Sequence, residues 1–169
     1  MNTQILNQIS CFLFLLFFLL CALHDGRTKT IPAGLIRLFF GIGLPVWLLR
    51  VFAALQSAVS PAQLSELLLS FLPGLLLLLL CRLAGNAIGS GDGLFLLVGG
   101  CYLPLTGLTL LLLTGIFLSG LLAILLLSLS RFRRRSMRKT TIPFIPCMLP
   151  GLWLFGGRIL SLLSLKEAL

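Results

Sequence analysis

Residues 93–130 form an uninterrupted stretch in which no side chain carries a charge. Across the whole chain of 169 residues, 59% of the side chains are hydrophobic and only 10% are charged. Soluble domains typically carry about 25% charged residues, so the solvent around this chain is expected to be lipid. Lipid offers no hydrogen bonds to the backbone, and long continuous apolar runs satisfy the backbone as helices. The sequence therefore predicts an all-α integral membrane fold.

The apolar runs predict a polytopic helix bundle with about six transmembrane helices. A spanning helix needs roughly 20 apolar residues, and residues 93–130 are too many for one helix, so this run is divided at Pro104. The expected spans cover residues 5–23, 31–55 and 64–83, a fourth span that ends at Pro104, and residues 106–130 and 142–165. Residues 1–169 are expected to form a single transmembrane domain without a soluble domain.

The fourth span raises a question of length. The residues from Gly93 to Leu103 would cover about 16 Å as a helix, whereas the apolar core of a bilayer is about 30 Å thick. The helix is therefore expected to begin before Asp92, near Asn86 or Ala87, unless the bilayer thins at this point. In either case Asp92 lies at or somewhat below the membrane surface. An unpartnered Asp in a spanning helix costs about 2.5–3.5 kcal/mol on insertion scales.

The distribution of Lys and Arg predicts the orientation. Cytoplasmic loops of membrane proteins are enriched in these residues, which accounts for the net charge of +9 without a nucleic-acid partner. One side of the expected bundle carries Arg27, Lys29, Arg37, Arg82, Arg131, Arg133, Arg134, Arg135, Arg138 and Lys139, and the other carries Arg50, Arg158 and Lys166. The first side is expected to be cytoplasmic, with both termini outside and both aspartates on the cytoplasmic side.

Asp25 and Asp92 are the only aspartates in the chain, and intramembrane ionisable residues are functional candidates by default. Two carboxyl groups that face each other across a small wet cleft cannot both ionise cheaply, so they share a proton and their pKa values separate. The ionised acid can then activate water while the protonated acid donates to a carbonyl oxygen, as in aspartic peptidases. The same acids could instead bind a proton or cation in a small transporter or channel.

The sequence GSGDG surrounds Asp92 with small residues. Gly89, Gly91 and Gly93 would let an extended substrate backbone approach the carboxyl group closely. The alternative is tight helix packing, because Gly85, Gly89 and Gly93 recur every four residues. The sequence alone leaves both interpretations open.

Three separated segments resemble the type IV prepilin peptidases, the GxGD membrane aspartic peptidases that remove leader peptides from prepilins. The segments are DGRTKTIP (Asp25 to Pro32), GSGD (Gly89 to Asp92) and IPFIPCMLPG (Ile142 to Gly151), and they occur in the family's order. The resemblance implies that Asp25 and Asp92 are the catalytic residues. It implies that the site is lined by Ile31, Pro32, Gly89, Gly91, Gly93, Pro143, Phe144 and Pro146.

The resemblance implies an aspartic endopeptidase that cleaves the leader of prepilins or pseudopilins at the cytoplasmic face of the bacterial inner membrane. Such substrates carry a basic leader followed by a hydrophobic helix, and the other expected partner is the lipid bilayer. Larger members of the family have an insert with paired CxxC motifs and methylate the new N-terminus. The five cysteines here form no CxxC, so we expect a peptidase without methyltransferase activity, with no metal and no cofactor.

Two positions depart from the family pattern. Ala33 stands where the family usually has Asn after Ile-Pro, and Leu94 stands where it usually has Lys. A cation near Asp92 would favour the ionised form of that acid, a role that Arg82 or Lys29 could take over. A catalytically inactive relative with the same fold is therefore an alternative, beside the small transporter.

Overall fold

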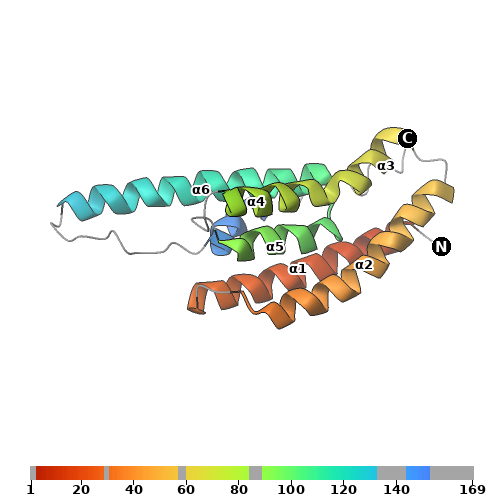
Figure 1. Cartoon of the computed structure of the whole chain (residues 1–169), viewed down its shortest axis with the longest axis horizontal. Helices are drawn as coiled ribbons and strands as arrows, with labels where there is room; N and C mark the ends of the chain where they lie inside the picture. Colours follow the sequence, from red (N-terminus) through yellow and green to blue (C-terminus); the bar gives the residue numbers. More distant parts are fainter. Residues whose placement is uncertain (1–2, 29–30, 57–59, 84–88, 133–143, 153–169) are drawn as a thin grey trace.

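The computed structural model describes residues 3–28, 31–56, 60–83, 89–132 and 144–152. In these ranges every regular element is a helix, and no strand is present (Figure 1). The elements are α1 (Thr3–Thr28), α2 (Ala33–Gln56), α3 (Pro61–Leu68), the 3₁₀ helix η1 (Leu69–Phe71), α4 (Leu72–Leu83), α5 (Ser90–Gly100) and α6 (Leu105–Phe132), followed by helical residues 144–152. The expected all-α fold is confirmed.

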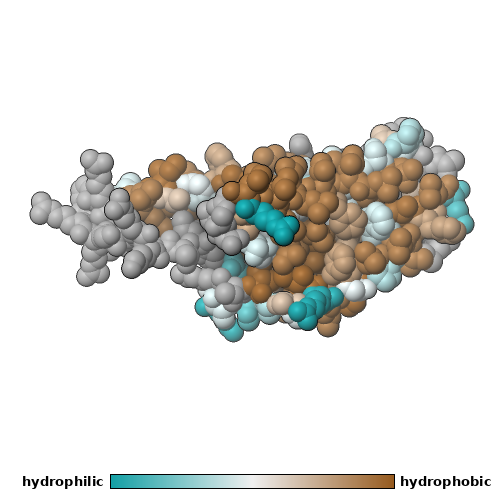
Figure 2. All heavy atoms as spheres, in the orientation of Figure 1, coloured by the Kyte–Doolittle hydropathy of each residue, from teal (hydrophilic) through white to brown (hydrophobic). Residues whose placement is uncertain are grey.

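Four stretches are long and apolar enough to cross a membrane, namely Ile5–Thr28, Ala33–Gln56, Pro61–Leu83 and Leu105–Ser128. They correspond to the first, second, third and fifth expected spans. Large side chains such as Phe12, Phe52 and Phe117 are exposed on the outside of the bundle, and Figure 2 shows a face that is mostly hydrophobic. Because an exposed apolar surface of this extent suits lipid and not water, the chain is a helical membrane protein.

The fourth expected span differs from the structure in its length. α5 begins before Asp92, as expected, but it starts at Ser90, and the extended backbone of Gly89 precedes it. Its 11 residues cover only about 16 Å, so α5 does not cross a bilayer by itself. The expected starting points, Asn86 and Ala87, lie outside the described residues and before the first residue of α5.

α1 is longer than the sequence suggested. The polar residues from His24 onward predict that the first span ends there, but α1 continues to Thr28, whose hydroxyl donates to the carbonyl oxygen of His24 at 2.9 Å. The change from apolar to polar residues marks a membrane surface, and helical hydrogen bonding continues past it. Asp25 therefore lies inside a helix and not in a loop.

The last two expected spans are described to different extents. The division at Pro104 is confirmed, because α6 begins at the next residue and the Leu108 N–H donates to the Pro104 carbonyl oxygen at 3.1 Å. Of the sixth expected span, only residues 144–152 are described, and they are helical. The remainder of that span lies outside the described ranges.

α5 packs closely along α4, because glycines on both helices leave room for the neighbouring chain. A Cβ atom added to Gly93 would lie 2.8 Å from the side chain of Leu78, and one added to Gly74 would lie 2.5 Å from the backbone nitrogen of Leu97. Real Cβ atoms do not approach this closely, so any larger residue would force the helices apart. α4 and α5 therefore form a tightly packed pair.

The bundle places both aspartates at the same end. α1 and α4 end, and α2 and α5 begin, at the left end of the bundle in Figure 1. Asp25 lies in the last turns of α1 and Asp92 in the first turn of α5. This arrangement agrees with the expected topology, in which both acids lie on one side of the membrane.

Candidate active site

Asp25 is bonded to the segment that carries the third motif. Its side chain is buried, with 7% exposed, and its Oδ2 accepts a hydrogen bond of 3.3 Å from the backbone N–H of Ile145. Pro146 lies close to Gly26, since a Cβ atom added to this glycine would be 3.9 Å from Cγ of the proline. The DGR and IPFIP segments, far apart in the sequence, therefore meet at Asp25.

Asp92 lies in the first turn of α5, where its backbone N–H donates to the carbonyl oxygen of Gly89 at 3.2 Å. Its side chain is half-buried. Burial, and secondly the charge of Asp25, raise the pKa of Asp92 to about 6. Asp92 therefore holds its proton at a pH where an ordinary aspartate is ionised. Asp25 therefore lies near enough for its charge to contribute to the raised pKa of Asp92.

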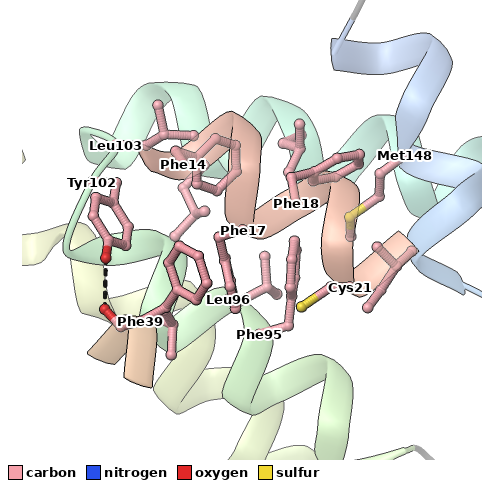
Figure 3. Close-up of a cluster of buried hydrophobic side chains, with 14 of the residues drawn as sticks. Phe14, Phe17, Phe18, Cys21, Phe39, Phe95, Leu96, Tyr102, Leu103 and Met148 are labelled. Atoms are coloured by element: carbon pink, nitrogen blue, oxygen red, sulfur yellow. Dashed lines mark hydrogen bonds between the residues drawn. The ribbon is translucent and has the colours of Figure 1, made fainter. Parts of the chain in front are cut away.

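An aromatic cluster joins the helices that carry the two acids. Phe95 of α5 contacts Phe17 and Phe18 of α1, with ring centroids 5.2 Å and 5.7 Å apart, and Phe17 contacts Phe39 of α2 at 5.0 Å (Figure 3). All four side chains are buried. The cluster thus forms a dry contact that holds α5 against α1 and α2.

The spacing along each helix turns both acids towards the side of this contact. Phe95 follows Asp92 by three residues, so the two share a face of α5. Cys21 and Phe18 precede Asp25 by four and seven residues, so all three share a face of α1, and both are fully buried. Because Phe18 and Phe95 are in contact, the face of α1 that carries Asp25 and the face of α5 that carries Asp92 are directed towards each other.

The first and second motifs also touch. A Cβ atom added to Gly91 would lie 3.1 Å from Cδ1 of Ile31, so the Ile-Pro segment packs on the GSGD turn. A Cβ atom on Gly89 would lie 3.3 Å from Oδ2 of Asp92, so a side chain there would crowd the carboxyl group. Gly93, by contrast, is buried against α4. Two of the three glycines therefore lie at the acid end of the site, and the third serves helix packing.

The other residues expected to line the site lie in different parts of the fold. Pro32 precedes α2, and its carbonyl oxygen accepts the N–H of Leu35 at 3.0 Å, so it starts that helix. Phe144 packs on α6, since a Cβ atom added to Gly115 would be 3.3 Å from its ring. Pro143 lies outside the described residues.

Two residues that contribute to the site, Ile145 and Phe95, were not predicted from the sequence. Ile145 acts through its backbone N–H, and no side-chain pattern reveals such a group. Phe95 had a usable signal, because it follows Asp92 by one helical turn and is one of only a few aromatic residues near that acid.

No cation is paired with Asp92 in the described part of the chain. Arg82 lies at the end of α4 and forms no ion pair with Asp92 there, and Lys29 lies outside the described residues. Leu94, at the position where the family usually has Lys, is 37% exposed. Within the same described ranges, no group of three His, Cys, Asp or Glu side chains is placed to hold a metal ion.

The fold and the two acids define a class of helical membrane proteins with an acid pair at one end of the bundle. The model of the type IV leader peptidase family matches residues 12–124, which include both aspartates and more than half of the chain. The chain belongs to the type IV leader peptidase family, and the resemblance inferred from the three motifs is confirmed at this level. The third motif lies beyond the matched residues. No curated protein and no solved structure matches the chain.

Proposed function

We propose that the protein is an aspartic endopeptidase of the bacterial cytoplasmic membrane that removes the leader from prepilins or pseudopilins. The observation that carries the proposal is that Asp25 and Asp92 lie at the same end of the bundle, on helices joined by the Phe18–Phe95 contact, with Asp25 near enough to contribute to the raised pKa of Asp92. Membership of the leader peptidase family supports peptide-bond cleavage in general. The acid pair supports the aspartic type, because two adjacent carboxyl groups with separated pKa values can supply both the base and the acid.

In the proposed mechanism Asp25 is the base and Asp92 is the acid. The Ile145 N–H stabilises negative charge on Asp25, whereas burial leaves a larger fraction of Asp92 protonated near neutral pH than an ordinary aspartate would keep. Asp25 takes a proton from water as the water oxygen bonds to the scissile carbonyl carbon, and Asp92 gives its proton to the carbonyl oxygen. The C–N bond of the tetrahedral intermediate then breaks. The amine leaves with the proton from Asp25, and one hydroxyl of the intermediate returns a proton to Asp92.

The proposed substrate has a basic leader followed by a hydrophobic helix. The hydrophobic helix of the substrate would lie in the lipid along the apolar outer surface of the bundle. Its scissile bond would lie at the end of the bundle that carries Asp25 and Asp92. Gly89 and Gly91 leave space beside Asp92, so an extended backbone can approach the carboxyl group. Because the sequence has no CxxC pair, we propose cleavage without methylation of the new N-terminus.

The test is co-expression with a prepilin and detection of the processed form by gel mobility. Asp25→Asn and Asp92→Asn are each expected to abolish processing while the protein still reaches the membrane. Glu66→Gln is the matched control, because it removes an acid that hydrogen-bonds Thr106 at 3.3 Å away from the proposed site. Normal processing by either aspartate variant would contradict the proposal.

Leu94 motivates a second candidate, a catalytically inactive relative, because no cation pairs with Asp92 in the described ranges. An inactive wild-type protein that gains cleavage with Leu94→Lys would favour this alternative. A protein without peptidase activity whose ion flux in liposomes is lost with Asp92→Asn would instead be a transporter.

A further inference from the structure

Arg50 is a buried cation in the second half of α2, with 7% of its surface exposed. α2 begins at the acid end of the bundle (Figure 1), so Arg50 lies towards the opposite end. A charged side chain inside a spanning helix is costly, and an apolar residue of similar volume would avoid that cost. The burial of this charge therefore needs an explanation, and the hydrogen bonds of Arg50 indicate one.

The guanidinium group joins three parts of the fold. Its Nε donates to Asn7 Oδ1 at 3.1 Å, and its Nη1 donates to Ser10 Oγ at 3.2 Å and to the carbonyl oxygen of Tyr102 at 2.7 Å. Ser10 Oγ also donates to the Tyr102 carbonyl oxygen at 2.8 Å. We name Arg50, Asn7, Ser10 and Tyr102 the Tyr102 clamp. It ties α1 and α2 to the turn that follows α5.

The other end of Tyr102 is fixed as well. Its hydroxyl donates to the carbonyl oxygen of Phe39 in α2 at 2.6 Å (Figure 3). A Cβ atom added to Gly43 would lie 2.8 Å from the Tyr102 ring, so the ring sits directly on the backbone of α2. Tyr102, two residues past the end of α5, is therefore held by both its backbone and its side chain.

The clamp and the acid pair lie at opposite ends of the same two elements. α1 carries Ser10 of the clamp and Asp25, and the α5 segment carries Asp92 at its start and Tyr102 just after its end. Because α5 is one continuous helix of 11 residues, a shift of its clamped end along α1 would carry Asp92 with it. The charge of Arg50 also lies at the C-terminal end of α5, where a helix dipole favours a cation.

We propose that Arg50 is a positioning residue that sets the register of α5 against α1 and so places Asp92 opposite Asp25. This proposal rests on the proposed peptidase function. Arg50 touches neither acid and acts only through the Tyr102 carbonyl and α5.

The kinetic test compares Arg50→Met with Arg50→Lys in purified, folded enzyme cleaving a prepilin. Arg50→Met is expected to lower kcat by about 10- to 100-fold, the range for a small misplacement of a reacting group, with KM changed less than about twofold. Arg50→Lys keeps a cation that reaches the carbonyl oxygen and is expected to recover most of kcat. Arg37→Met, an exposed cation on the same helix, is the control and should change neither constant. An unchanged kcat in folded Arg50→Met would overturn the proposal.

Hydrogen exchange of the same variants provides a readout that does not need activity. Arg50→Met is expected to speed amide exchange in α5 by about tenfold or more, as local opening becomes easier, and to leave α6 unchanged. Unchanged α5 exchange would overturn the clamp whether or not the protein cleaves prepilin. Faster α5 exchange in a protein whose wild-type form cleaves no prepilin would support the clamp and overturn the peptidase function instead.

Discussion

The ring of Phe95 stacks on the ring of Phe17, with centroids 5.2 Å apart and planes inclined by 17°. Phe95 also meets Phe18 edge to face. The stack joins α5 to α1 about one helical turn from Asp92. It therefore sets the separation between the two helices on which the acids lie, and the geometry of the acid pair depends on apolar packing beneath it.

Replacing Phe95 should harm activity beyond its effect on stability. We expect Phe95→Ala to lower the free energy of unfolding by about 3–5 kcal/mol, as for other buried aromatic residues. The cleavage rate of the folded fraction should fall further, because α5 moves into the space and displaces Asp92. Melting temperature in detergent and cleavage rate measure the two effects. Phe117→Ala, 72% exposed on α6, is the control, and similar losses in both variants would argue against this account.

Most of the helical architecture could be predicted from hydropathy, because lipid selects long apolar runs. Four of these runs are candidate spans in the structure, and Pro104 marks the boundary before α6. The end of α1 could not be predicted, since a helix continues past the membrane surface where hydropathy changes. The shortage of residues between Gly93 and Leu103 was visible in the sequence, but the start of α5 at Ser90, and not near Asn86 or Ala87, was not.

The acidic side chains of the site could be predicted from the sequence, whereas the backbone N–H that contacts one of them could not. Two lone aspartates and the charge distribution placed both acids at one end, and the structure agrees. The Ile145 donor depends on how residues 144–152 fold back onto α1, which no local pattern reveals. The charge distribution placed Arg50 on the side opposite the aspartates, and the structure buries it among Asn7, Ser10 and Tyr102.

The hydrogen bond to Asp25 can be removed without removing a side chain. Ile145→Pro and Ile145→Ala both shorten a fully buried residue, but only proline lacks the N–H, and proline is tolerated in the first turn of a helix. Both variants should lose about 2–5 kcal/mol of stability. Only Ile145→Pro should lose a further 10-fold or more in kcat, as expected for a hydrogen bond to a charged group. Equal kcat values for the two folded variants, measured at saturating prepilin, would refute the role of this N–H.

The contact between Gly91 and Ile31 predicts a compensating pair of substitutions. Gly91→Val would press on Cδ1 of Ile31, which an added Cβ already approaches to 3.1 Å, and should cost about 1–3 kcal/mol by overpacking. Ile31→Ala removes the atoms in conflict, so the double variant should recover stability and cleavage relative to Gly91→Val. The control is Gly120→Val, because no atom lies within 4 Å of an added Cβ there. Simple addition of the two losses in a double-mutant cycle would show that the two motifs do not pack together.

Asp92→Asn should stabilise the protein at high pH and not at low pH. Burial, and secondly Asp25, raise the pKa of Asp92 from 3.8 to about 6 in the folded protein. Below pH 3.8 the acid is protonated in both folded and unfolded states, and above pH 6 it is ionised in both. The stability of the wild-type protein therefore falls as the pH rises between these values, since the unfolded state loses its proton first. Asparagine is neutral throughout and does not show this fall.

The expected gain for Asp92→Asn at pH 8 is on the order of 1 kcal/mol, after allowance for solvent screening of a half-buried group. Melting temperatures in detergent at pH 4, 6 and 8 give the comparison, with Glu66→Gln as the control for loss of an acid elsewhere. The difference between Asp92→Asn and the wild-type protein should grow from pH 4 to pH 8. A difference that stays constant across the three pH values would mean that Asp92 titrates as an ordinary aspartate, and the proposed mechanism would then lose the raised pKa on which the protonated fraction of Asp92 depends.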